Sequence, residues 1–82
     1  MLTSSQIRAA RALLSWSQPA LAKASALSLP TIVRMESRLG PGRSSAANVE
    51  AVQRALEDAG VTFLHSTGDS GPGVRLTRGF ER

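Results

Sequence analysis

Few side chains in this 82-residue chain are of the types that carry out catalysis or bind metals. His65 is the sole histidine and there is no cysteine, which excludes a histidine cluster and thiolate metal sites. Glu57 and Asp58 form a carboxylate pair, but adjacent residues of a helix diverge by about 100° and cannot share one substrate. We therefore expect the protein not to be an enzyme and to need no metal or cofactor.

The charged side chains point to binding instead. Ten basic residues against six acidic ones give a net charge of +4, and nine of the ten are arginine. Residues 1–45 carry six basic groups and one acid, Glu36, whereas residues 46–82 carry four basic groups and five acids. A positive first half is typical of a protein that binds a polyanion such as nucleic acid. The alternative is an arginine-rich surface that is merely solvated.

The sequence predicts no targeting or membrane segment. Its start, Met-Leu-Thr-Ser-Ser, lacks the charged and apolar regions of a signal peptide. The uncharged runs 12–22 and 24–33 contain Pro19 and Pro30, and they fall far short of the roughly 20 apolar residues that span a bilayer. We expect no membrane association and a cytoplasmic location.

Four helices are expected to position the charged side chains. Thr3 and Gln6 form a capping-box pattern at the start of the first helix. Ser17 and Ser28 are suitable N-caps, each followed by a proline in the first turn. Gly60 is suited to the end of the fourth helix. The expected helices are 4–15, 18–25, 28–37 and 46–59.

The apolar period changes to that of strands after the fourth helix. Residues 61–65 and 74–77 read as two short strands of a hairpin, so the expected fold class is mainly α with a C-terminal two-stranded β-hairpin. We expect residues 1–60 and 61–82 to form one domain. A two-stranded hairpin leaves edges to pair, so residues 61–77 are a candidate homodimer interface.

Two short helices joined by one tight turn, over residues 17–37, form a helix-turn-helix pattern. In such a motif the first helix braces against the DNA backbone and the second presents its N-terminal residues to base edges in the major groove. The short turn requires the helices to pack through small residues. The small or apolar residues available for this packing are Ala22, Ala24, Ala26 and Leu27.

Residues 10–37, ARALLSWSQPALAKASALSLPTIVRMES, resemble the helix-turn-helix of the Cro/C1-type regulators, the XRE family. The similar positions are Trp16-Ser17-Gln18, Leu21-Ala22, Ser28, Pro30-Thr31-Ile32, Arg34 and Glu36. The resemblance covers about residues 1–60. It implies a four-to-five-helix Cro/C1-type bundle, a recognition helix at about 28–37, and an operator-like site on double-stranded DNA as partner.

The resemblance also implies roles for individual residues. Gln18 would bind a phosphate at the start of the second helix, and Arg34 would make a bidentate contact to guanine. Arg11 and Glu36 would form a partly buried salt bridge between the first helix and the recognition helix. The full DNA-binding set implied is Gln18, Ser28, Leu29, Thr31, Arg34, Arg38 and Arg43.

The sequence departs from the family pattern in three ways. Ala26 stands in the tight turn where the family usually has glycine, so either an alanine adopts a left-handed conformation or the turn adjusts. Arg38 stands where glycine usually follows the recognition helix. Leu29 and Val33 place two apolar side chains on the outward face of that helix, where polar residues are more usual.

The apolar pair leaves two functions open. Leu29 and Val33 could contact thymine methyl groups beside Arg34. Alternatively, Leu29, Val33 and Arg34 could bind a protein, since an apolar patch with an arginine rim is typical of protein interfaces. In size and layout the chain is also similar to QseM-like small antiactivators, a resemblance that implies sequestration of a transcriptional activator protein.

Overall fold

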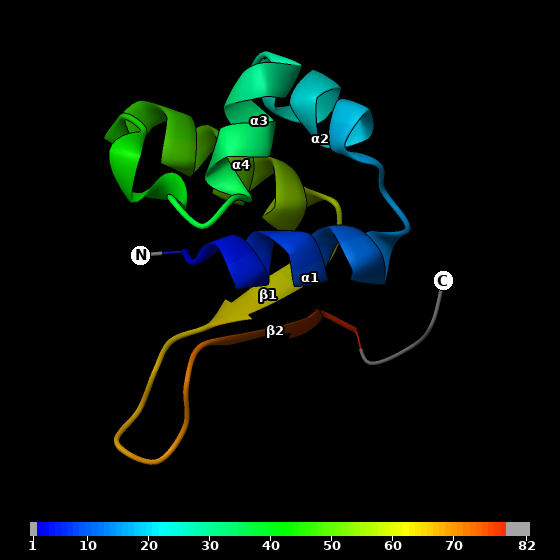
Figure 1. The fold of residues 1–82 in the computed structure, drawn as a ribbon. Coiled ribbons are helices and arrows are strands. Elements are labelled where there is room, and N and C mark those ends of the chain that lie inside the picture. Colours follow the sequence, from blue (N-terminus) through cyan, green and yellow to red (C-terminus); the bar gives the residue numbers. More distant parts are fainter. Residues whose placement is uncertain (1, 79–82) are drawn as a thin grey trace.

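The computed structural model describes residues 2–78 and consists of helices followed by a C-terminal antiparallel hairpin, as the sequence predicts (Figure 1). The elements are α1 (Ser4–Leu14), α2 (Gln18–Ser25), α3 (Leu29–Met35), a 3-10 turn η1 (Pro41–Arg43), α4 (Ala46–Asp58), β1 (Val61–Leu64) and β2 (Gly73–Leu76). Helix α1 lies between the α2–α3 pair and the hairpin. The tail 79–82, which belongs to the predicted C-terminal part, lies outside the described residues.

The capping box at the start of α1 is confirmed. The Thr3 hydroxyl accepts from the Gln6 backbone N–H at 3.1 Å, and the Gln6 side-chain oxygen accepts from the Thr3 N–H at 2.9 Å. The helix ends one residue earlier than predicted because Ser15 adopts a left-handed conformation, with φ 57°. The N–H of Trp16 then donates back to the Arg11 carbonyl, which closes the helix.

Serine N-caps begin the other three α-helices. The hydroxyls of Ser17, Ser28 and Ser45 each accept from the backbone N–H three residues later, at 3.1–3.3 Å. Helix α3 is shorter than the predicted 28–37, because the backbone of Ser28 is extended and that of Glu36 leaves the helix. The predicted loop at 38–45 contains the short turn η1.

Helix α4 ends at Asp58, one residue earlier than predicted, and the chain turns at Gly60. The φ of Gly60 is 116°, a conformation that a side chain would oppose, so glycine suits this position as the sequence predicts. The turn brings the chain directly into β1.

One hydrophobic core joins all the elements. It contains the inner faces of the four helices and of the hairpin. Its fully buried large side chains are Ile7, Leu21, Ile32, Met35, Val52, Leu56 and Val61. Trp16 and Leu27 lie at its edge, partly buried. Burial of α3 through Ile32 and Met35 leaves the opposite side of that short helix in solvent.

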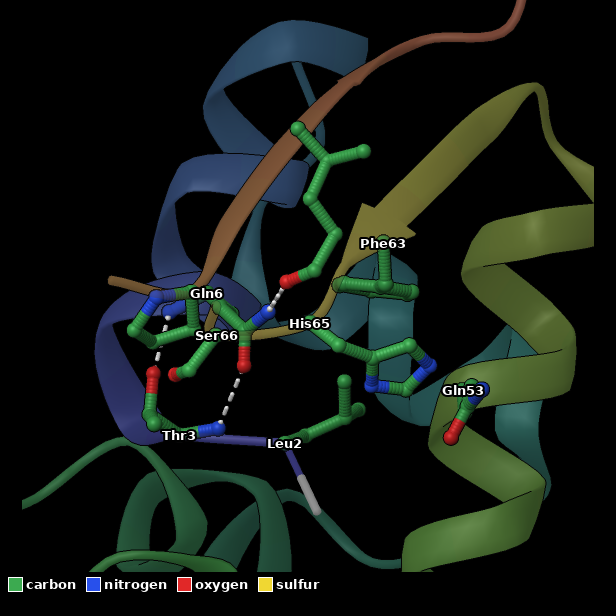
Figure 2. Close-up of a pocket in the computed structure, with 9 residues that line it drawn as sticks. Leu2, Thr3, Gln6, Gln53, Phe63, His65 and Ser66 are labelled. Atoms are coloured by element: carbon green, nitrogen blue, oxygen red, sulfur yellow. Dashed lines mark hydrogen bonds between the residues drawn. The ribbon is translucent and has the colours of Figure 1, made fainter. Parts of the chain in front are cut away.

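The hairpin packs on α1 and α4. Leu64 pairs with Gly73 and Val61 with Leu76. Strand β1 begins at the predicted residue and ends one residue before the predicted 61–65, whereas β2 is shifted by one residue from the predicted 74–77. Gln6 sets this end of the hairpin, since its side-chain amide donates to the carbonyls of Leu64 at 3.2 Å and Gly73 at 2.9 Å. Figure 2 shows the Gln6 side chain hydrogen-bonded to Thr3 and directed at the hairpin.

The turn between α2 and α3 keeps the tight geometry although it lacks glycine. Ala26 has φ 60° and ψ 31°, so an alanine adopts the left-handed conformation here and the turn does not adjust to avoid it. The N–H of Leu27 donates to the Ala22 carbonyl at 3.0 Å. A β-carbon in this conformation costs roughly 1–2 kcal/mol.

Replacing Ala26 with glycine is expected to raise the free energy of unfolding by about 0.5–1 kcal/mol. Relief of the left-handed strain outweighs the extra backbone entropy of glycine, which is about 0.5–1 kcal/mol. Ala24, exposed and within α2, is the matched control: Ala24→Gly should lower the stability by a similar amount. Urea unfolding measures both, and a loss of stability in Ala26→Gly would contradict the left-handed turn.

Candidate functional site

The helix pair α2–α3 is held against α1 by one buried carboxylate. Glu36, directly after α3, accepts two hydrogen bonds from the Arg11 guanidinium, both at 2.7 Å, so the structure brings the expected pair together. The Glu36 side chain is 2% exposed and that of Arg11 19%. The hydrogen bond to Glu36 raises the pKa of Arg11 above its ordinary value, although burial works in the opposite direction.

Two further hydrogen bonds reinforce this ion pair, and both are accepted by backbone carbonyls. Arg11 also donates to the Trp16 carbonyl at 3.0 Å, which ties the α1–α2 connection to the pair. The guanidinium of Arg8 donates to the Glu36 carbonyl. Glu36 therefore fixes α3 relative to both preceding helices.

Gln18 joins this network at the start of α2. Its side-chain amide donates to the Glu36 carboxylate at 3.1 Å, and the residue is half-buried. A phosphate contact from Gln18, as the family resemblance implies, would use the other amide hydrogen.

The outward face of α3 is mainly apolar. Leu29 is 40% and Val33 45% exposed, one helical turn apart, and the exposed Arg34 follows directly. Thr31 is half-buried, and its hydroxyl is hydrogen-bonded to that of Ser28 at 2.8 Å. Among the predicted groove-facing residues, Arg34 is the long polar side chain of α3; it is exposed, and its guanidinium donates to the Thr31 hydroxyl at 3.5 Å.

The segment that follows α3 contributes another exposed apolar side chain. Leu39 is 59% exposed, the largest exposure of any large hydrophobic side chain in the described part of the chain. Arg34, Leu39 and Arg43 line one hollow of about 390 Å³, together with Gly40, Ser44, Ser45 and Asn48. Arg38 is exposed but does not line the hollow. We call Leu29, Val33, Arg34, Leu39 and Arg43 the α3 surface.

Sequence reasoning missed Leu39 and the hollow. A signal was present, because Leu39 is the one large aliphatic residue in the loop sequence RLGPGRSS. The hollow could not be read from the sequence, because α3, η1 and the start of α4 form it together.

In the segment that contains α2 and the α3 surface, the exposed charges are positive. Four basic residues, Lys23, Arg34, Arg38 and Arg43, are exposed between residues 17 and 45, and the one acid of that segment, Glu36, is buried. The acids of α4 are also exposed: Glu50 lies in its first half, and Glu57 and Asp58 lie at its end. The positive first half expected from composition therefore includes four exposed basic residues in the segment of α2, α3 and η1, of which Arg34 and Arg43 line the same hollow.

The other candidate side chains lie outside this surface. His65 is exposed at the end of β1, and Glu57 accepts a hydrogen bond from Gln53 at 3.2 Å on α4. In residues 2–78, no three histidine or carboxylate side chains gather as metal ligands would. None of the helices in that range is long and apolar enough to cross a membrane.

No protein-family model matches the sequence, and neither does any curated protein.

Proposed function

We propose that this chain is a small transcriptional regulator with a Cro/C1-type helix-turn-helix, and that α3 is its recognition helix. The observation that supports this best is the α2–α3 pair, which is anchored by Ile32 and Met35 and presents its outward face among exposed arginines. In the leading form of the proposal the partner is double-stranded DNA. Arg34 then contacts a base edge, while Arg38 and Arg43 contact phosphates.

DNA binding predicts a strong dependence on salt and on Arg34. The protein should bind random duplex DNA at about 50 mM salt and lose affinity as salt rises, because phosphate contacts release counterions. On a preferred site, Arg34→Ala should weaken binding by about 5- to 160-fold, which corresponds to the roughly 1–3 kcal/mol of one bidentate base contact. Fluorescence anisotropy with labelled duplex measures both effects.

Arg54→Ala is the control for that titration, since Arg54 is exposed on α4 outside the α3 surface. Its affinity should stay close to that of the unmodified protein. Absence of binding to any duplex at about 50 mM salt would contradict the DNA-binding function, because non-specific phosphate contacts dominate there.

A second function is favoured by a specific observation. Leu29, Val33 and Leu39 each expose 40–59% of their surface, and Leu39 lines the hollow. DNA can contact such side chains through little other than thymine methyl groups. In this second form the protein is an antiactivator, which binds an activator protein through the α3 surface and so prevents it from acting. Leu29→Ser combined with Val33→Ser should then abolish partner binding and leave the fold intact.

A further inference from the structure

We propose, building on the second of these functions, that the α3 surface binds an acidic amphipathic helix of the partner protein. The apolar side chains of that helix would pack on Leu29, Val33 and Leu39, and its carboxylates would pair with Arg34 and Arg43. This assigns to the surface a partner of defined chemistry.

The apolar part of the surface has the dimensions of a helix contact. Leu29 and Val33 are one turn apart on a helix of seven residues, which is about 10 Å long. Two turns of a partner helix have the same length and present apolar side chains at i, i+3, i+4 and i+7. Leu39 extends the contact beyond the end of α3.

The hollow beside Leu39 offers a place for one side chain of the partner. Its volume of about 390 Å³ exceeds what a leucine or phenylalanine side chain requires, and two arginines, Arg34 and Arg43, are among its lining residues. An apolar anchor in a recess, surrounded by polar groups, is the usual arrangement of an interface hot spot.

Charge complementarity selects an acidic partner. Every exposed charged side chain between residues 17 and 45 is basic, and the single acid there is buried against Arg11. A basic helix would bring like charges together as it docks, and such contacts cost several kcal/mol of binding free energy at protein interfaces. A helix with carboxylates on both sides of its apolar stripe can pack on the apolar side chains of the α3 surface and also form ion pairs with its arginines.

The test uses the intact protein and a synthetic peptide of about 18 residues, long enough for a helix. The peptide carries leucines at i, i+3, i+4 and i+7 and glutamates elsewhere on its flanks; a second peptide has lysines in place of the glutamates. Fluorescence polarisation at low salt should show the acidic peptide bound at least about tenfold more tightly than the basic one. Amide-shift mapping should place its contacts on residues 29–48.

Variants locate the contact. Leu29→Ser with Val33→Ser should weaken binding of the acidic peptide at least about tenfold, the loss of one hot-spot contact or more. Leu64→Ser is the matched control, because Leu64 is also 40% exposed but lies on the hairpin, and its affinity should not change. Arg34→Ala with Arg43→Ala should weaken binding mainly at low salt.

The outcomes separate the proposals. If both peptides bind equally through Leu29 and Val33, the acidic character of the partner is wrong and the antiactivator function stands. If neither peptide binds and duplex DNA shifts the α3 resonances, the inference and the antiactivator function are both overturned in favour of DNA binding. If neither peptide nor DNA binds, or if the double serine variant keeps its affinity for the acidic peptide, the inference is overturned.

Discussion

Replacing Glu36 with leucine should lower the free energy of unfolding by about 3 kcal/mol. Arg11 would then keep its charge in a site where its side chain is 19% exposed, with neither carboxylate oxygen to accept its two short hydrogen bonds. Removing one partner of a buried pair costs about 3–5 kcal/mol in other proteins, and the partial exposure of Arg11 favours the lower end. Against a total of about 4–12 kcal/mol for a domain of this size, this is a large share.

The double variant separates the loss of the pair from the loss of one partner. Arg11→Met alone should also be strongly destabilising, because it leaves the Glu36 carboxylate buried. Arg11→Met combined with Glu36→Leu should cost less than either single change, since no unpaired charge remains. Urea unfolding of the four proteins measures the cycle, and Glu50→Leu, at an exposed position of α4, should stay within about 0.5 kcal/mol.

A different result would change the role given to Glu36. If Glu36→Leu is as stable as the unmodified protein, the carboxylate does not hold α3 in place. If the double variant is stable but binds neither DNA nor the acidic peptide, the ion pair orients α3 for binding more than it stabilises the fold.

Replacing Ile32 with alanine should cost about 3–4 kcal/mol, within the range of about 2–5 kcal/mol for isoleucine-to-alanine changes in protein cores. Ile32 is 0% exposed and is the central contact of α3 with the core. Its removal leaves a cavity that the seven-residue helix cannot fill without moving. The urea midpoint should fall with the slope unchanged.

The adjacent residue is the control for this prediction. Val33 follows Ile32 in the chain but is 45% exposed, so Val33→Ala should change the stability by less than about 0.5 kcal/mol. Val33→Ala should also weaken the binding of any partner that packs on the α3 surface. Equal stability losses in the two variants would contradict the assignment of Ile32 to the core and Val33 to the surface.

Local sequence patterns were sufficient for most of the fold. The capping box at Thr3, the serine caps and the proline positions act within one turn of the chain, so each helix start was predictable. Helix ends were less predictable. Ser15 adopts a left-handed conformation, and Glu36 leaves the helix, and their side-chain types did not indicate this.

Gln6 shows what local pattern cannot supply. Its backbone and side-chain oxygen take part in the predicted capping box, which involves a residue three positions away. Its amide nitrogen binds the carbonyls of Leu64 and Gly73, 58 and 67 residues along the chain. This contact joins segments that are distant along the chain, so no local periodicity could have indicated it.

The sequence by itself determined the order of helices and hairpin, the concentration of positive charge in the first half, and the apolar character of Leu29 and Val33. These follow from residue type and spacing along the chain. Only the tertiary structure decided that Gln18 is bound to Glu36, that Leu39 stands in solvent, and that Arg34 and Arg43 share a hollow. Such features depend on which distant segments pack together. The packing that buries one face of α3 also decides which of its side chains remain exposed to a partner.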